Sequence, residues 1–131
     1  MIAFIIVDFP VLLFPIIIYI MVFTPSNRTI LDLAINLWIS NNASAVTAYG
    51  DINTWDTSLI TDMSDLFKNR KFTFNSNISA WNVSNVTNMS YMFYFSAFNK
   101  GIGSWDVSKV TNMRNMFAGA QKFNRNISIW D

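Results

Sequence analysis

The sequence lacks cysteine, histidine and glutamate altogether, although it contains 131 residues. Without histidine or cysteine, the chain cannot form a Ser-His-Asp or Cys-His catalytic site, an ordinary zinc site or a disulfide framework. Its acidic side chains are eight aspartates, and no two of them stand in a catalytic signature. The composition therefore predicts a protein that is not an enzyme and that uses no metal and no cofactor.

Charge is also scarce, since charged residues make up 13% of the chain and the formal net charge is +1. The basic residues are scattered rather than clustered, which argues against a phosphate-binding surface and a nucleic-acid partner. Six of them flank the variable loops of the repeats described below, where a solvated, mildly basic surface is the simplest interpretation. They are Lys68, Arg70, Lys71, Lys100, Lys122 and Arg125.

Residues 1–23 form the most hydrophobic run, MIAFIIVDFPVLLFPIIIYIMVF, in which the single charge is Asp8. This length suits a bilayer-spanning helix, but no basic residue precedes it and Asp8 would be costly near the bilayer centre. Three interpretations stay open: a membrane anchor or signal-like segment, residues upstream of the natural start, and a buried helix. The first predicts a protein at the membrane, the cell surface or outside the cell, and the second predicts a cytoplasmic one.

A pair of helices is expected over residues 24–50. Asn27 or Thr29 can cap a first helix that ends between Ser40 and Asn42, and a second helix over residues 43–48 would stop at Gly50. An amphipathic pair of this kind would cover the first apolar face of a repeat array, so this segment is predicted to be an N-terminal cap. The apolar stripe expected on the first helix is Ile30, Leu33, Ala34, Leu37 and Trp38.

The segment 51–131 consists of about three repeats of 24–26 residues. Successive tryptophans are 26, 24 and 25 residues apart, a spacing typical of repeat arrays. Because Trp130 and Asp131 are the first two residues of a further string, we expect the array to be truncated at the C-terminus. The three complete strings are WDTSLITDMSDLF at 55–67, WNVSNVTNMSYMF at 81–93 and WDVSKVTNMRNMF at 105–117.

Two intervals are identical in every repeat and indicate its packed core. The Phe that ends each string lies twelve positions after its Trp, and each following Trp lies seven positions after the Phe of a Phe-Asn pair. All variation in length falls between these segments, as in a surface loop. We expect ladders of buried side chains, and we favour burial of the tryptophans over a carbohydrate-stacking row. The apolar ladder positions are Trp55, Trp81, Trp105, Trp130, Phe67, Phe93, Phe117, Phe74, Phe98, Phe123, Ile78, Ile102 and Ile127.

Each repeat is predicted to contain one short parallel strand and one short helix. The strand would run from Ile to Trp of the FN-x-x-I-x-x-W pattern, with residues 51–55 as the first strand, and the helix would follow an Asp or Asn N-cap. The predicted fold class is therefore an α+β repeat solenoid, a leucine-rich-repeat-like stack of short parallel strands and short helices behind a helical cap. A transmembrane helix would precede it if residues 1–23 are an anchor.

Polar and aromatic positions outside the apolar ladder are assigned separate roles. The amides of Asn75, Asn99 and Asn124 are expected to bond to the backbone of the adjoining repeat, in a structural role. Seven Asn-x-Ser/Thr sequences occur, and those in the cap, at Asn27 and Asn42, are the better glycosylation candidates because the others coincide with the repeat pattern. In the variable loops, the candidates for contact with a partner are Phe72, Tyr94 and Phe95.

The pattern W-[DN]-[VT]-S-x-[VI]-T-[DN]-M-x-x-[LM]-F, followed by FN-x-x-I-x-x-W, resembles the repeats of BspA-like leucine-rich-repeat surface proteins. The same unit is found in mycoplasma surface lipoproteins whose domain has no assigned function. The resemblance covers residues 51–131, and a similar lead-in extends it to about residue 30. It implies an exported solenoid that attaches to or recognises partners, without identifying a ligand.

Two functional hypotheses follow from the repeats and from this resemblance. The first is a non-catalytic surface recognition or adhesion module that contacts a protein or a glycan, and that is attached to a membrane if residues 1–23 are an anchor. The second is a structural scaffold or stacking module, or a fragment of a longer repeat protein. Because no closing cap is visible after the third string, end-to-end self-association is also expected under the second hypothesis.

Overall fold

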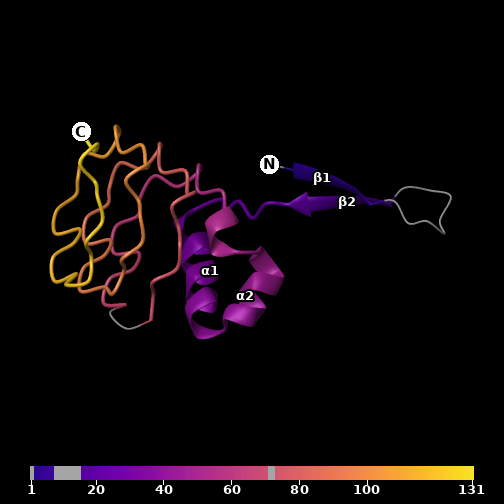
Figure 1. Ribbon diagram of the computed structural model, residues 1–131, viewed down its shortest axis with the longest axis horizontal. Helices are drawn as coiled ribbons and strands as arrows, with labels where there is room; N and C mark the ends of the chain where they lie inside the picture. Colours follow the sequence, from indigo (N-terminus) through magenta and orange to yellow (C-terminus); the bar gives the residue numbers. More distant parts are fainter. Residues whose placement is uncertain (1, 8–15, 71–72) are drawn as a thin grey trace.

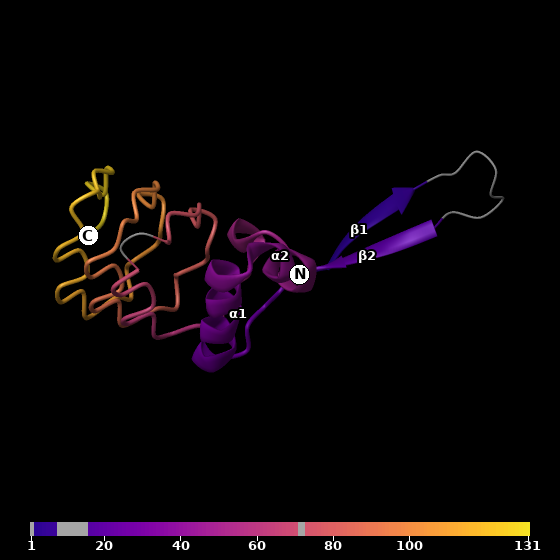
Figure 2. The same ribbon diagram turned by 90° about the horizontal axis from the view of Figure 1, so that it is seen from below.

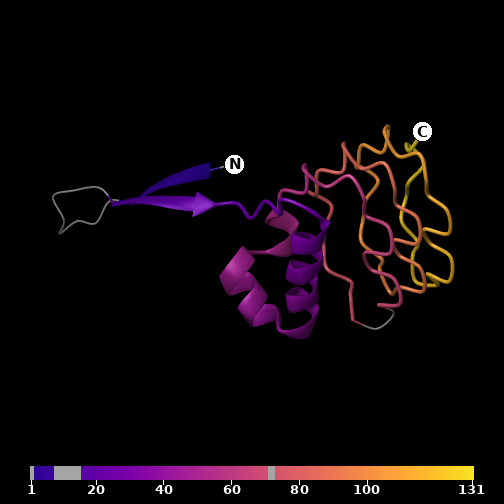
Figure 3. The same cartoon turned by 180° about the vertical axis from the view of Figure 1, so that it is seen from behind.

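The computed structural model describes residues 2–7, 16–70 and 73–131, with the backbone alone for 2–7 and 16–20. An antiparallel hairpin projects to one side of two helices, and a series of turn-rich coils lies on the other side, with the C-terminus at the far end (Figures 1 and 2). Helix α1 lies between α2 and the coils in the views of Figures 1 and 3. The helices thus separate the hairpin from the repeats.

The hairpin consists of β1 (Ile2–Val7) and β2 (Ile16–Met21), which pair antiparallel from Ile2 opposite Met21 to Val7 opposite Ile16. The prediction of a transmembrane helix over residues 1–23 was therefore wrong for the described part of this segment. Both strands are rich in isoleucine, whose branched Cβ favours extended backbone over helix. Over the whole described part of the chain, none of the helices has the length and apolar character needed to cross a membrane.

Two helices occupy the segment before the repeats, and asparagines begin both. Helix α1 (Arg28–Ser40) starts after Asn27, whose side chain accepts a hydrogen bond from the Ile30 N–H at 3.0 Å. Helix α2 (Asn42–Tyr49) starts after Asn41, which accepts from Ser44 in the same way, and stops at Gly50, where φ is +74°. A short 3₁₀ turn, η1 (Ile52–Thr54), follows where a first strand was expected.

The buried face of α1 agrees only in part with the stripe expected from its sequence, since Ala34 is buried and Trp38 packs against the core. Leu31, Ala34 and Ile35 are buried, whereas Leu33 is 58% exposed and Ile30 also faces solvent. Both sets of residues recur with helical spacing, so periodicity alone could not decide between them. The outcome follows from packing, because Leu31, Ala34 and Ile35 join the same apolar cluster as the side chains of the repeats.

The three copies, defined as residues 55–80, 81–104 and 105–129, lie side by side and are joined by backbone hydrogen bonds (Figure 1). Alternate N–H groups of the first copy point toward the second copy. Those of residues 63, 65, 67 and 69 donate to the carbonyls of 88, 90, 92 and 94 at 2.8–2.9 Å. The N–H groups of residues 89, 91, 93 and 95 donate to the carbonyls of 112, 114, 116 and 118 in the same register. Each copy thus covers one face of the copy before it.

The predicted α+β fold class was nevertheless wrong. In the described part of the copies, regular secondary structure is limited to isolated parallel bridges, Asp62 with Asn88 and Asn88 with Asn112. Each expected Ile-to-Trp strand is a turn, closed for example by the Trp81 N–H donating to the Ile78 carbonyl at 3.1 Å. The expected helices do not form because their N–H groups are used between copies and because positive φ angles, as at Asp65, interrupt them.

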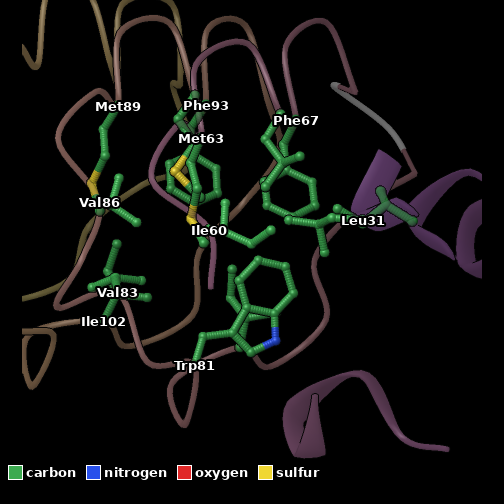
Figure 4. Packing of buried hydrophobic residues seen from close by; sticks show 14 of the residues in the cluster. Leu31, Ile60, Met63, Phe67, Trp81, Val83, Val86, Met89, Phe93 and Ile102 are labelled. Carbon is green, nitrogen blue, oxygen red and sulfur yellow. The ribbon is translucent and has the colours of Figure 1, made fainter. Parts of the chain in front are cut away.

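The core runs through the middle of the copies and is closed at one end by α1. Figure 4 shows Phe93 and Phe67 next to each other in the core, with Leu31 of α1 on the far side of Phe67. The rings of Phe67 and Phe93 stack with centroids 5.4 Å apart, and those of Phe93 and Phe117 with centroids 5.5 Å apart. Identical side chains in successive copies therefore fill one continuous apolar core.

Candidate functional site

The apolar ladder positions divide into buried and half-buried members, according to the copy that supplies them. Those of the first two copies, together with Trp105, are at most 4% exposed, as are Ile52 and Val83 beside them. Phe117, Phe123 and Ile127 of the third copy, and Trp130 directly after it, are only partly buried. The indole N–H of Trp130 is buried and has no hydrogen-bond partner among the described residues, whereas that of Trp105 donates to the Ile78 carbonyl at 3.3 Å.

The asparagines singled out in the sequence lie at or near the surface. The Asn75 side chain accepts from the Asn99 N–H at 2.8 Å, and the Asn99 side chain accepts from the Asn124 N–H at 3.0 Å. Asn27 is exposed and caps α1, while Asn42 is exposed in the first turn of α2. The side-chain oxygen of Asn27 therefore has a structural partner, and its amide nitrogen donates to the Ser26 hydroxyl at 3.4 Å.

Aspartates at the start of the first and third strings, Asp56 and Asp106, hold turns together rather than forming an acid–base pair. Hydrogen bonds from the hydroxyl and the N–H of Ser58 hold the pKa of Asp56 below its usual 3.8, and Ser108 lowers the pKa of Asp106 in the same way. In the second copy, the neutral Asn82 accepts the corresponding bond from the Ser84 N–H at 3.1 Å. The turn needs an acceptor oxygen there, whether charged or neutral.

These lowered pKa values predict loss of stability in acid. A carboxyl whose pKa is lower in the folded state stabilises the fold above its unfolded pKa, and this contribution is lost as pH falls through the folded pKa. We expect the double variant Asp56→Asn/Asp106→Asn to lose less stability than the parent protein between pH 7 and pH 3, measured by urea unfolding. The reverse change, Asn82→Asp, should steepen the acid dependence; equal pH profiles for all three proteins would contradict this account.

An aromatic patch formed by Lys68, Tyr91, Tyr94 and Phe95 lies on the loop edge of the first two copies. The rings of Tyr91 and Tyr94 meet edge to face with centroids 5.4 Å apart, and those of Tyr94 and Phe95 do so at 4.6 Å. The Lys68 ammonium lies 5.0 Å from the Tyr91 ring centroid and 5.8 Å from that of Tyr94. Phe95 is 40% exposed, so the patch offers an aromatic surface beside a positive charge.

The Lys68 ammonium is held in place by its own copy. It pairs with the Asp65 carboxylate at 2.8 Å, and this hydrogen bond, with a smaller contribution from the charge of Asp65, raises the pKa of Lys68. Lys68 therefore stays protonated throughout the physiological range. Its charge faces the tyrosine rings of the next copy, so the patch is assembled only when the two copies lie against each other.

The backbone of the patch adopts an unusual conformation. Tyr91 and Phe95 have φ angles of +57° and +50°, in the left-handed region. The corresponding residues are Asp65 and Asn69 in the first copy and Asn115 and Gly119 in the third, and all four also have positive φ. Asp, Asn and Gly tolerate this region, whereas bulky aromatic residues there are outliers that cost of order 1–2 kcal/mol each. The second copy thus carries strained aromatic residues where its neighbours carry residues suited to the turn.

Sequence reasoning named two of the four patch residues as partner contacts, Tyr94 and Phe95, and it missed Tyr91 as a member of the patch. The signal for Tyr91 was present, because it occupies the position of Asp65 and Asn115 in the other strings, but its conformational cost was visible only in the backbone. Phe72, the third predicted contact, lies outside the described residues.

Other described parts of the surface have fewer side chains that could bind a ligand. A groove between residues 21–24 and the C-terminal end of α2 is lined by Met21, Val22, Phe23, Val46, Tyr49 and small or hydroxyl residues, and its described lining includes no charged residue. Among residues 2–7, 16–70 and 73–131, no three acidic side chains are grouped to hold a metal ion. The aromatic patch is therefore the candidate site favoured by its side chains.

The comparisons with known proteins identify a family for most of the chain. A family model described as "Mycoplasma protein of unknown function, DUF285" matches residues 37–131, which is more than half of the sequence. Neither the curated proteins nor the solved structures contain a match to this chain. The family match supports the resemblance to mycoplasma proteins but does not extend to BspA-like leucine-rich repeats. The chain therefore belongs to the DUF285 family of mycoplasma proteins of unknown function.

Proposed function

We propose that this protein is a non-catalytic surface recognition module that binds a protein or glycan partner through the patch of Lys68, Tyr91, Tyr94 and Phe95. The observation that carries the proposal is the positive φ of Tyr91 and Phe95. Backbone strain of this kind persists where the rest of the fold enforces it, and it clusters at binding and catalytic sites. Aromatic side chains kept at such a cost favour a role in contact over a role in packing.

The chemistry of the patch suits recognition more than reaction. Partly exposed Tyr and Phe rings supply apolar contact area with little loss of side-chain entropy on binding, and the tyrosine hydroxyls add hydrogen bonds. The adjacent Lys68 ammonium suits a partner with acidic or hydroxyl groups next to an apolar face. Both a sugar ring and a protein loop can present such a combination, so the two classes are separated by experiment.

The double variant Tyr91→Asn/Phe95→Asn tests the proposal because it installs a turn-compatible residue already used in the other copies. The full chain and the variant would be applied to a glycan array and to a phage-displayed random-peptide library. We expect selective binding by the parent protein to one of the two, and a loss of at least about tenfold in affinity in the variant. The free energy of unfolding should be unchanged or raised by up to about 1 kcal/mol, because the strain is relieved.

A matched control is Leu59→Asn, which removes another exposed apolar side chain outside the patch. The control should bind like the parent protein. Equal binding by parent and double variant, or a failure of the parent to bind any glycan or peptide selectively, would contradict the proposal. A variant that loses stability instead of keeping it would show that Tyr91 and Phe95 serve packing.

The proposal also places the repeats outside the cytosol, where a surface partner is accessible. A tag after Asp131 would be followed in intact cells during treatment with added protease. We expect the tag to be removed before the membrane is broken. Protection of the tag until lysis would contradict a surface role and would favour an intracellular scaffold.

A further inference from the structure

Phe95 of the aromatic patch lies against a glycine of the third copy. A Cβ atom added at Gly119 would lie 2.8 Å from Cδ2 and from Cγ of the Phe95 ring, and 2.9 Å from its Cδ1. A point at nearly equal distances from three neighbouring atoms of a six-membered ring lies over the centre of the ring, not beside its edge. Gly119 therefore packs on one face of the Phe95 ring, so the patch rests on the third copy as well as on the first two.

The positive φ of Gly119 does not by itself require glycine. Its φ of +72° is close to the +60° of Asn69, the corresponding residue of the first copy. Asparagine is among the residues that tolerate this region of φ. A Cβ atom at residue 119 would, however, come closer to the Phe95 ring than the usual contact distance between carbon atoms, about 3.5–4.0 Å. The ring of Phe95 therefore explains why residue 119 has no side chain.

Backbone hydrogen bonds hold Phe95 and Gly119 in this arrangement. The Phe95 N–H donates to the carbonyl of Ala118, the residue directly before Gly119, at 2.9 Å. The Gln121 N–H donates to the Gly119 carbonyl at 3.0 Å and closes the turn. The Tyr94 ring meets the Phe95 ring at 73°, with centroids 4.6 Å apart. Two neighbours thus limit the rotation of the Phe95 ring, while Phe95 as a whole remains 40% exposed.

We propose that Gly119 is a positioning residue for partner binding, because it keeps the Phe95 ring in one orientation and thereby completes the aromatic patch. This inference rests on the proposed function, in which Phe95 contacts the partner. A ring that is already fixed loses little side-chain freedom on binding, so its contacts contribute more to affinity. A side chain at residue 119 would displace the ring, which can rotate about χ1, because the backbone is held by the hydrogen bond between the copies.

Gly119→Asn tests this role, and it should weaken binding by at least about tenfold. The probe is the array glycan or library peptide that the parent chain binds most tightly, labelled with fluorescein and followed by fluorescence anisotropy. Gly101→Asn is the matched control, because a Cβ there meets no atom within 4 Å and the corresponding residues of the other copies are Asn77 and Asn126. The control should bind like the parent chain.

Two further readouts separate positioning of the ring from a requirement of the backbone alone. In the parent chain, the NMR signals of the Gly119 α protons should be shifted upfield by the face of the Phe95 ring, and Phe95→Asn should abolish this shift. In urea unfolding, Gly119→Asn should lower the midpoint of the parent but not that of the Phe95→Asn variant, in which the clash is absent. An equal decrease in both backgrounds, or unshifted α protons in the parent, would overturn the inference.

The binding results distinguish the role of Gly119 from the proposed function itself. Selective binding by the parent, together with equal binding by Gly119→Asn, would overturn the role of Gly119 and leave the proposed function intact. Failure of the parent to bind any glycan or peptide selectively would overturn both. Weaker binding by Gly119→Asn, with shifted α protons in the parent and no effect of Gly101→Asn, would support the positioning role.

Discussion

Replacing Phe93 with alanine is expected to lower the free energy of unfolding by about 3–5 kcal/mol, the usual cost of removing a fully buried phenylalanine. Phe93 is completely buried and stacks on Phe67, Phe98 and Phe117, with centroids 5.4, 4.3 and 5.5 Å away. It therefore contacts all three copies, and its loss opens a cavity in the middle of the array. A loss of this size would be a large part of the stability of a small domain.

The matched control is Phe117→Ala, the same change one copy further along. Phe117 is only partly buried, so the cavity opens towards solvent and less apolar area is lost. Urea unfolding of both variants should give a loss for Phe117→Ala of about half that for Phe93→Ala. Equal losses would mean that Phe117 is as well enclosed as Phe93, contrary to its partial burial.

Local sequence signals predicted the ends of the two helices but not the backbone path of the repeats. The helix ends lie at Asn27, Asn41 and Gly50, because capping is decided by a few neighbouring atoms. The strand and helix predicted for each repeat were wrong, since apolar residues one, four and five positions after the Asp or Asn cap suit several backbone paths equally well. The choice was made by hydrogen bonds between copies, 24–26 residues apart, which local propensity does not describe.

The candidate site could be predicted only in part for a related reason. Tyr94 and Phe95 were suggested by their place in a loop of variable length, which sequence shows directly. Tyr91 lies inside the fixed string, where it looked like an ordinary core or turn position. Tyr91 belongs to the candidate site because of its φ of +57° and its contact with the Lys68 ammonium of the preceding copy. Neither feature can be read from the sequence.

The second copy has two glycines where the other copies have Asn and Ser, and the packing of the third copy explains one of them. Gly101 and Gly103 stand where the first copy has Asn77 and Ser79, and where the third has Asn126 and Ser128. The repeat pattern alone would suggest that serine restores the usual residue at position 103. The structure gives a different answer, because the backbone of the third copy approaches Gly103 closely.

A Gly103→Ala substitution is expected to destabilise the fold by about 1–3 kcal/mol, the cost of overpacking a well-packed site. An added Cβ would lie 2.5 Å from the Asn126 carbonyl oxygen, which belongs to the backbone and cannot rotate away. The two copies would have to separate, and the hydrogen bonds between them would weaken. Gly103→Ser should destabilise at least as much, although it matches the residue found in both other copies.

Gly101→Ala provides the control for Gly103→Ala, because it makes the same change two residues away with the opposite expected sign. An added Cβ at Gly101 meets no atom within 4 Å, and neither glycine has a positive φ. Alanine there only reduces the freedom of the unfolded chain, so we expect stability to rise by about 0.4–1 kcal/mol. Urea unfolding of the two variants should move the midpoint in opposite directions. A shift in the same direction for both would show that the copies tolerate more separation at residues 103 and 126 than their close contact implies.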